Sequence, residues 1–443
     1  GYDIPAIYAE IKGVYTNSTP VDAYRGAGRP EAVYQVERLI ENAAHEMGID
    51  PLELRERNLI QANQMPYKTA VDITYNVADL PVLMSKAKKL ARYDELREEQ
   101  ENLRNKGIYM GIGTCVFFDM AGAGPTKMMN ELGAKIGCYD VASCRVHPSG
   151  KVTIFAGSHS HGQAHETTWS QIAADRLGCD IEDIELVEGD TDRVPFGIGT
   201  WGSRSLSTAG MAVAVSADRI IEKANKLAAH MLECAVEDLI REEGGFTVKG
   251  TDRSITFADV ADAAYHRGDR PEGLEIGLEE TVFYDPKDCN YPSAVHICVV
   301  LVDPQTGNVT LRDYTAVDDV GTIINPMVLE GQVHGGLVQG IGQALMEECA
   351  YDSETGQYVS GTFMDYAMPR ASDLPSFALD SYTTLDPDNP LGIKGAGESG
   401  TLGAPACVCN AVVDAIWGLG VQQVTQPMTP RKIWHAIQNA NGN

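Results

Sequence analysis

Apolar residues near the start of the chain recur with the period of a helix. Between residues 30 and 47 they fall at three- and four-residue steps, with Pro30 in the first turn and Gly48 placed to end the helix. Asp50 and Pro51 then start a second, short helix. This part of the chain is therefore predicted to be helical.

The pattern changes after a charged, helix-prone stretch. Residues 83–106 predict one solvated connecting helix, which marks the best boundary between a small piece and a large one. Beyond it, strand-like runs flank turn residues twice, which predicts a hairpin of 142–146 with 152–156 and another of 295–302 with 309–317. Helical and strand patterns thus mix along the chain, and we predict an α+β fold.

A polar, glycine-rich segment follows each predicted hairpin. Gly162-Gln163 leads into a helix at 167–177, and Gly331-Gln332 leads into a helix at 337–346. No residue-level repeat accompanies this order. The recurrence predicts two related α+β halves.

Composition narrows the possible partners. The 443 residues include 35 Lys and Arg against 62 Asp and Glu, a formal charge of −27, and 44% of residues are hydrophobic. This composition is typical of a globular protein of two or three domains. Nucleic acids and anionic membrane surfaces are bound through clustered Lys and Arg, so neither is an expected partner.

Cysteine usage and the apolar runs bear on compartment. The ten cysteines are scattered with no Cys-x-x-Cys pair, which predicts reduced, mostly buried thiols and a cytoplasmic protein without its own iron–sulfur cluster. No run of about 18 apolar residues predicts a membrane span. The chain begins at Gly1 rather than Met, which we interpret as a fragment or a processed product.

The first candidate for chemistry is the loop 23–30, which enters the first helix. Its glycines, the helix N-terminus and the guanidinium groups of Arg25 and Arg29 suit an anion or an oxo group. The alternative is a glycine-rich helix entry with surface arginines.

The second candidate is the loop 157–168. It contains three histidines with the spacing of metal ligands, and two acidic residues downstream complete a possible hydrolase site. These residues are His159, His161, His165, Asp190 and Asp192. Alternatively, the histidines are hydrogen-bonded loop residues and Gln163 is the useful group.

Two further segments join them. Residues 199–208 contain successive backbone amides, serine hydroxyls and one arginine, a combination that suits phosphate. They lead into a helix predicted from about Ala209. The alternative is an ordinary serine-rich N-cap. No P-loop or Rossmann motif is present. In the loop 392–400, Glu398 is flanked by glycines, and a partly desolvated glutamate is a natural general base, although most lone glutamates are simply solvated.

In this order, these segments resemble the molybdenum hydroxylase family, which includes xanthine dehydrogenase and aldehyde oxidoreductase. The resemblance is closest to the C-terminal part of the large molybdenum-binding subunit of aerobic carbon monoxide dehydrogenase-type enzymes. It extends to Tyr284-Asp285-Pro286, 318–321, 324–326 and 330–336.

The resemblance implies a role for each matching residue. Glu398 is the essential glutamate that acts as general base, and Arg25 lies beside molybdenum and stabilises charge on the substrate. The pterin cofactor, which itself holds the metal through its dithiolene without side-chain ligands, is bound by a larger set. That set is Gly26, Gly162, Gln163, Ala164, Gly202, Ser203, Arg204, Ser205, Gln332 and Gly397.

Three departures from the family pattern matter. Ala164 replaces the second glycine of the Gly-Gln-Gly pterin loop. Gly26 stands where the copper-containing carbon monoxide dehydrogenases have a cysteine, so an aldehyde or an N-heteroaromatic ring is the expected substrate and carbon monoxide the alternative. Ala27 lacks the aromatic ring found in purine-oxidising members.

The resemblance also implies an assembly. Residues 1–75 would complete a first cofactor-binding domain and residues 76–443 would form the second. The cofactor would be molybdopterin cytosine dinucleotide, with [2Fe–2S] clusters and FAD on partner subunits and the rest of the large subunit on another segment, in a dimer of heteromers. The open alternatives are a His-based hydrolase and a catalytically silent homologue.

Overall fold

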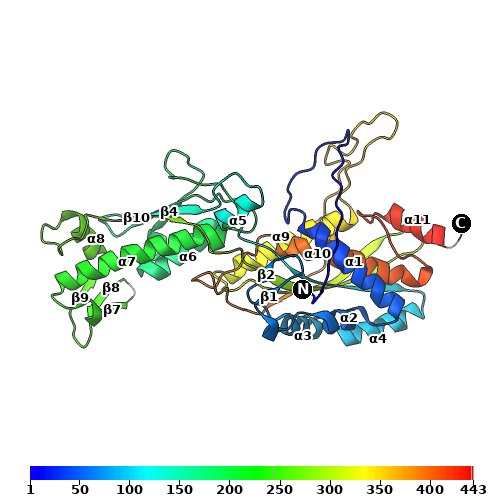
Figure 1. The fold of residues 1–443 in the computed structure, drawn as a ribbon, viewed down its shortest axis with the longest axis horizontal. Helices are drawn as coiled ribbons and strands as arrows, with labels where there is room; N and C mark the ends of the chain where they lie inside the picture. The colour runs from blue at the N-terminus through cyan, green and yellow to red at the C-terminus, as the bar shows by residue number, and fades with distance from the viewer. Residues whose placement is uncertain (243, 441, 443) are drawn as a thin grey trace.

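The computed structural model describes residues 1–242, 244–440 and 442. The molecule is elongated and consists of two lobes joined end to end (Figure 1). The α7 lobe comprises residues 126–284, and the α10 lobe comprises residues 1–118 and 293–440. Both lobes contain helices and strands, which confirms the α+β prediction.

The helices and strands alternate irregularly along the chain. The α-helices are α1 (Arg29–Met47), α2 (Pro51–Asn58), α3 (Leu80–Ala91), α4 (Tyr93–Arg104), α5 (Thr126–Glu131), α6 (His165–Leu177), α7 (Met211–Met231), α8 (Phe257–His266), α9 (Pro326–Leu345), α10 (Ser399–Ile416) and α11 (Pro430–Ala440). The strands are β1 (Tyr67–Lys68), β2 (Thr74–Tyr75), β3 (Tyr109–Phe118), β4 (Asp140–Val146), β5 (Val152–Ala156), β6 (Ile184–Val187), β7 (Leu239–Glu242), β8 (Gly245–Val248), β9 (Ser254–Thr256), β10 (Leu278–Tyr284), β11 (Ser293–Val302), β12 (Val309–Asp319) and β13 (Phe377–Ser381). Short 3-10 helices lie at η1 (Ala62–Gln64), η2 (Ile181–Asp183), η4 (Val236–Asp238), η5 (Ala371–Asp373) and η6 (Trp417–Leu419), and a π-helical turn lies at η3 (Ser205–Gly210).

The two main sheets share a topology. The α7 lobe has the strand order β10-β4-β5-β6 and the α10 lobe has β13-β12-β11-β3. In each, an antiparallel hairpin (β4-β5 or β11-β12) is followed by a helix (α6 or α9) and then by a strand parallel to the second hairpin strand (β6 or β13). Both predicted hairpins and the two related halves are therefore confirmed.

The sheet of the α10 lobe is covered on both faces. Helix α10 packs against β3 and β11 on one face, with α9 and α1 beside it, while α3 and α4 pack on the other. Every residue of α10 is buried. A Cβ at Gly111 or Gly113 of β3 would lie within about 2 Å of an α10 carbonyl oxygen, so only glycine allows this approach.

The predicted first helix is confirmed almost to the residue. Helix α1 starts at Arg29, with Pro30 in its first turn, and Gly48 ends it in the left-handed conformation. The predicted connecting helix over 83–106 is wrong in form. Arg92, with a φ of 52°, breaks it into α3 and α4, and α3 buries an apolar face against the sheet rather than being solvated.

The second glycine-rich segment is also placed differently from the prediction. Asn325 caps α9 through its side chain and Pro326 is the first helical residue, so the helix begins well before residue 337. Gln332 therefore lies within a helix rather than in a loop. Likewise the helix predicted from about Ala209 begins with the π turn η3 at Ser205.

Helix α10 has a second noteworthy property. Together with η6, residues 399–419 are long and apolar enough to cross a membrane, with a mean hydropathy of 1.5. The run-length criterion missed this segment because polar residues interrupt it. Since 83% of its most apolar window is buried, we interpret it as the central core helix of its lobe.

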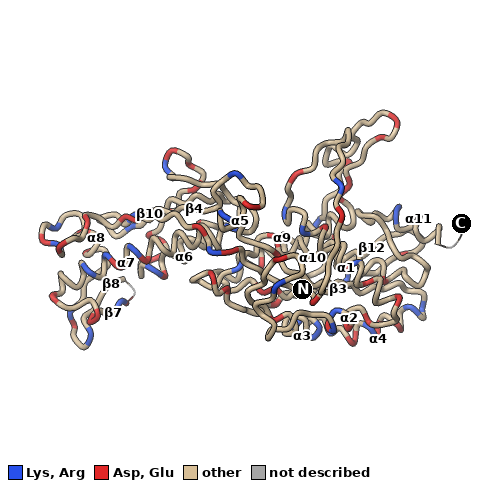
Figure 2. The backbone as a smooth tube through the Cα atoms, viewed as in Figure 1, with Lys and Arg blue, Asp and Glu red and all other residues tan. Residues whose placement is uncertain are grey.

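The cysteines are mostly buried, and the charged residues of both signs are mixed along the chain. All ten cysteines are unpaired and seven of them are buried, as predicted. Acidic and basic residues are interspersed along the backbone of both lobes (Figure 2).

An extended arm projects from the α10 lobe (Figure 1). It combines residues 3–23 with the loop around 351–368, and many of its apolar side chains are exposed. The two segments of the arm are connected by a hydrogen bond that the Thr19 amide donates to the Tyr351 hydroxyl oxygen at 3.1 Å.

Candidate cofactor-binding and active site

Glu398 lies where the two lobes meet. It is the N-cap residue of α10 and is only 8% exposed. Its Oε1 accepts a hydrogen bond from the Gly26 amide at 2.8 Å, and its Oε2 accepts from Arg29 Nη2 at 2.9 Å and from Ser203 Oγ at 2.8 Å. Three donors from two lobes therefore hold one carboxylate in a fixed orientation.

The loop before α1 supplies two of these donors because of its backbone shape. Gly26 has a φ of 99°, in the region that favours glycine. A Cβ at this position would lie 2.6 Å from Pro30 Cγ. Glycine thus allows the turn that points the residue 26 amide at Glu398 and leaves no side chain for a metal.

Arg25 lies beside Glu398 and is held by four backbone and side-chain acceptors, of which three are within 3.1 Å. Its Nε donates to the Gly397 carbonyl at 2.6 Å, Nη1 to Gln339 Oε1 at 3.1 Å and Nη2 to the Gln332 carbonyl at 3.0 Å. Burial lowers the pKa of Arg25, although the nearby Glu398 acts in the opposite direction. Arg25 therefore joins α9 to the start of α10.

The pairing of Arg29 with Asp119 was not predicted from the sequence, in which Arg29 stood only as one of the two arginines of the loop 23–30. Arg29 Nη1 lies 2.6 Å from Asp119 Oδ1 while its Nη2 binds Glu398, so the guanidinium bridges two carboxylates. Burial raises the pKa of Asp119 to about 7, with Glu398 adding to the effect and Arg29 opposing it. The available signal was an acidic residue directly after β3, followed by the glycine-rich run 120–125.

The two loops of the α7 lobe that the sequence singled out lie against each other. The Gly199 amide donates to the Gly157 carbonyl, and Thr200 Oγ1 accepts from the His159 amide at 3.2 Å and from Ser205 Oγ at 2.8 Å. Since Ser203 in the second loop also binds Glu398, these contacts connect the pterin-loop candidates to the glutamate.

The second of these loops fits an anionic group. The backbone amides of residues 200–203 donate to no acceptor within the described part of the chain. Gly202 and Ser203 have left-handed backbones, and Arg204 returns to the right-handed region. Successive unpaired amides in turns of this kind can form an anion-binding concavity.

The side chain of Arg204 does not face that concavity. It is fully buried, with Nη1 2.9 Å from Asp140 Oδ2 and Nη2 donating to the carbonyls of Cys138 and Tyr139 at 3.0 and 2.9 Å. Burial lowers its pKa and raises that of Asp140. Arg204 therefore anchors the loop and leaves its backbone to face a ligand.

The predicted pterin loop is open to solvent. Gly162 is exposed, with a φ of 95° and open space where a Cβ would stand. Gln163 Oε1 accepts from the His161 amide, and Ala164 adopts the left-handed conformation as N-cap of α6. In the α10 lobe, Gln332 Oε1 lies 3.4 Å from Arg25 Nη2, so Gln332 is next to Arg25.

The three histidines do not converge on a common point. His165 is buried, donates from Nδ1 to Glu188 at 3.0 Å and stacks on Trp169 at 4.5 Å between ring centroids. Burial raises the pKa of Glu188, but hydrogen bonds from His165 and Ser158 hold it below its ordinary value. Among the described residues, these histidines form no three-ligand group suited to a metal ion.

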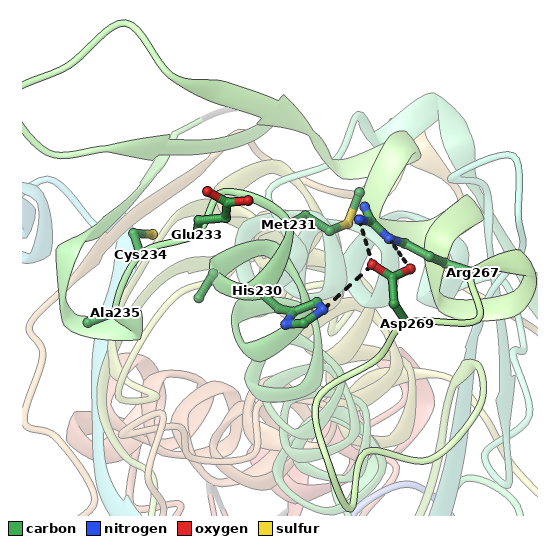
Figure 3. Close-up of a pocket in the computed structure, with 8 residues that line it drawn as sticks. His230, Met231, Glu233, Cys234, Ala235, Arg267 and Asp269 are labelled. Carbon is green, nitrogen blue, oxygen red and sulfur yellow. Dashed lines mark hydrogen bonds and ion pairs between the residues drawn. The ribbon is translucent and has the colours of Figure 1, made fainter.

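A separate pocket lies at the far end of the α7 lobe. It has a volume of about 600 Å³ and is lined by polar side chains, including Arg267 and Asp269, which pair at 2.6 Å, and His230 (Figure 3). It contains none of the residues linked to Glu398, and we assign it no part in the site.

Comparison with known proteins decides the family. The model of the molybdopterin cofactor-binding domain matches residues 86–375, and a second model of the same description matches residues 1–59. The chain belongs to the molybdenum hydroxylase family. The amides of residues 200–203 and the open Gly162 loop fit the phosphate and polar edge of such a cofactor, which brings molybdenum with its pterin.

Several relatives and solved structures are similar over almost the whole chain. The carbon monoxide dehydrogenase large chain of Hydrogenophaga pseudoflava is 41% identical over 99% of this chain, and the 6-hydroxypseudooxynicotine dehydrogenase complex subunit gamma of Paenarthrobacter nicotinovorans is 36% identical. Quinoline 2-oxidoreductase from Pseudomonas putida 86 superimposes with a TM-score of 0.90 at 37% identity, covering 95% of this chain and 54% of that one. The chain spans 55% of the Hydrogenophaga relative, and a little over 50% of the other two.

Proposed function

We propose that this chain forms the catalytic part of a molybdenum hydroxylase that hydroxylates an aldehyde or an N-heteroaromatic carbon. The observation that carries the proposal is the Glu398 carboxylate, oriented by Gly26, Arg29 and Ser203 at the junction of the lobes. Oε1 receives one hydrogen bond and keeps a lone pair for a proton. Glu398 is thus arranged as a general base.

The remaining residues have supporting roles. When bound, the molybdenum cofactor supplies oxygen transfer and two-electron redox chemistry. The amides of residues 200–203 hold its phosphates, and Gln163 and Gln332 hold its pterin from the two lobes. Arg25, fixed by Gly397 and Gln332, keeps an Nη1 hydrogen for charge that develops on the substrate.

The finer assignments rest on family likeness. The cofactor is molybdopterin cytosine dinucleotide, supported by the Gly-Ser-Arg-Ser form of the phosphate loop at residues 202–205. Electrons pass to [2Fe–2S] clusters and FAD on partner subunits, and a separate segment supplies the remainder of the large subunit. The assembly is a cytoplasmic dimer of heteromers.

Carbon monoxide oxidation is the second candidate, because the carbon monoxide dehydrogenase large chain is 41% identical. Residue 26 argues against it. Glycine provides no thiolate for a soft metal, and a Cβ there would collide with Pro30. The His-based hydrolase has no comparable support, since His165 is paired with Glu188.

The test uses the complete complex purified with its cofactors. Glu398→Gln should lower kcat/KM for the best aldehyde or N-heterocycle by about 10²–10⁴-fold, because the general base is lost while the amide can still accept hydrogen bonds. Molybdenum content should not change. The matched control is Glu237→Gln, an exposed glutamate in the α7 lobe, which should have wild-type activity.

Two results would contradict the proposal. Full activity of Glu398→Gln would identify a catalytically silent homologue or a base elsewhere. Carbon monoxide as the preferred substrate in a screen of all three classes would replace hydroxylation. Denaturing extraction that released no cytosine nucleotide would remove the dinucleotide assignment alone.

A further inference from the structure

A second polar cluster lies at the opposite end of α10 from Glu398. Asp414 is near the C-terminus of this helix, about 24 Å from residue 398 at 1.5 Å per residue. It faces Glu41 and His45, which are one turn apart on α1. Nothing in the proposed reaction uses these three residues.

Their spacing is unsuited to direct hydrogen bonds. His45 Nε2 lies 3.7 Å from Glu41 Oε1 and 3.6 Å from Asp414 Oδ1, and the three atoms lie within 4.8 Å of one another. A hydrogen bond between nitrogen and oxygen needs about 2.7–3.2 Å. Ligand atoms about 2.1 Å from a tetrahedral zinc ion lie about 3.4 Å apart, close to the separations found here.

Hydrogen bonds from neighbouring residues occupy one oxygen of each carboxylate and leave the other oxygen free among the residues that the structure describes. Glu41 Oε2 is bound by Arg55 Nη1 at 2.9 Å, and Asp414 Oδ2 is bound by Arg97 Nη1 at 3.2 Å and by the Ile112 amide at 2.8 Å. Each carboxylate therefore has one oxygen engaged and turns the other toward His45.

Burial makes the unengaged oxygen of Glu41 informative. Glu41 is fully buried, yet its Oε1 has no hydrogen-bond partner within the described chain, and neither has His45 Nε2. A buried carboxylate oxygen without a partner is unfavourable, because its contact with water is lost and no hydrogen bond replaces it. A bound cation would satisfy both atoms at once.

The charge balance points the same way. Arg55 pairs with Glu37 and Glu41, and Arg97 pairs with Asp50 and Asp414. Four carboxylates against two guanidinium groups leave a formal charge of −2 in a largely buried network. A divalent cation neutralises it.

Two features hold the imidazole in place. His45 follows Glu41 by four residues, so both side chains lie on the same face of α1. The His45 ring also stacks on Trp417 with a centroid separation of 4.2 Å and an interplanar angle of 12°. The ring is therefore fixed with Nε2 toward the two oxygens.

We propose that Glu41 Oε1, His45 Nε2 and Asp414 Oδ1 bind a structural zinc ion. Three ligands of mixed nitrogen and oxygen type leave a fourth position for water, and Arg97 Nη2, which has no partner among the described residues, is available to donate to it. The ion would connect the C-terminal end of α1 to the C-terminal end of α10. At the opposite ends of the same two helices, Arg29 is bonded to Glu398.

The experiment measures zinc, independently of molybdenum and of activity. The purified complex is stripped with a chelator and titrated with Zn²⁺ by calorimetry, and crystals are measured above and below the zinc absorption edge. We expect one zinc per chain, a higher Tm after loading, and an anomalous peak between the three ligand atoms. Absence of that peak at saturating zinc would overturn the proposal.

Variants separate this site from other histidines. His45→Gln should weaken zinc binding by about 100-fold or more, since loss even of an outer partner costs 10–100-fold. His435→Gln is the matched control, because His435 also lies beside a tryptophan but is exposed. Equal binding by His45→Gln and the wild type would contradict the assignment. The wild-type anomalous peak decides the matter if His45→Gln fails to fold.

Discussion

The two lobes place their functional groups differently although their sheets share a topology. In the α7 lobe, the segment after the hairpin remains a loop until Ala164, and the loop 199–204 beside it is anchored by Arg204. In the α10 lobe, Asn325 and Pro326 start α9 early, so Gln332 stands on a helix. Glu398 likewise lies at a helix start.

The difference shows how one topology provides two kinds of support. Open loops present backbone amides, which suit a large polar cofactor, and a buried ion pair is needed to hold them. Helix ends present a few side chains in fixed directions, which suits a base such as Glu398. Substitutions can therefore affect each kind of support separately.

The largest expected effect is on the loop anchor. Arg204→Met should destabilise the protein by about 3–5 kcal/mol, because Asp140 is left buried and unpaired. Urea unfolding measures the change. Arg145→Met, which breaks an exposed pair with Glu279 in the same lobe, should cost no more than about 1 kcal/mol. Equal costs would show that the buried anchor does not support the loop.

A pH effect is expected at the start of α10. Burial raises the pKa of Asp318 to about 6 from 3.8, with Asp319 adding to the effect and the Ser399 hydroxyl opposing it. The folded protein binds this proton more tightly than the unfolded chain. The resulting stability is present below pH 3.8 and is lost as the pH rises through about 6.

Asp318→Asn should remove this dependence. Relative to the variant, the wild type should lose about 2 kcal/mol of unfolding free energy between pH 4 and 6.5, since each pKa unit corresponds to about 1.4 kcal/mol and part of the effect lies below pH 4. Denaturant unfolding at several pH values checks this. Parallel pH profiles for the two proteins would refute the assignment of the effect to Asp318.

The turn before α1 should be sensitive at one glycine more than at another. Gly26→Ala should cost about 1–2 kcal/mol from its positive φ and lower activity by about 100-fold as the amide moves away from Glu398. Gly28 also has a positive φ, 85°, but a Cβ at this position would meet open space. Gly28→Ala should therefore lose only the stability that the left-handed backbone costs an alanine. Steady-state kinetics of both variants test this, and equal activity losses would count against the Gly26 contact.

The smallest effect is expected at the cap of α6. Ala164→Gly should stabilise the protein by about 1 kcal/mol, because a left-handed φ of 59° suits glycine better. Ala173→Gly, in the interior of the same helix, should destabilise it by about 1 kcal/mol. Thermal unfolding measures whether each variant is more or less stable than the wild type. A loss of stability in both variants would show that the left-handed backbone at residue 164 is not strained for alanine.

Local signals explain which elements were predictable. Pro30 and Gly48 bound α1 through their own backbone preferences, and the two hairpins follow from nearby strand and turn residues. The break at Arg92 has no such signal, because an arginine in the left-handed conformation is imposed by packing of α3 and α4. Local chemistry thus predicts elements better than the joints between them.

The candidate site divides in the same way. Motif order placed Arg25, Ser203, Gln332 and Glu398 on a common ligand. The structure pairs Arg25 with Gln332 and Ser203 with Glu398 by hydrogen bonds, and Arg25 also bonds the carbonyl of Gly397, the residue before Glu398. Arg29 and Asp119 are paired only by the fold, so their spacing in the sequence could not predict this contact. Burial of Arg204 against Asp140 is also a tertiary property, which the polar loop sequence concealed.

The glycine contacts between β3 and α10 have a consequence for synthesis of the protein. The Ile112 amide binds Asp414, a residue 302 positions later in the chain. At about 5–20 residues per second, a ribosome takes about 15–60 s to make the intervening segment. During that time α10 has not been synthesised, so the face of β3 that it covers in the folded protein stays uncovered. Glu398, the proposed general base, is synthesised near the end of this interval, so the nascent chain acquires it only shortly before α10 can cover β3.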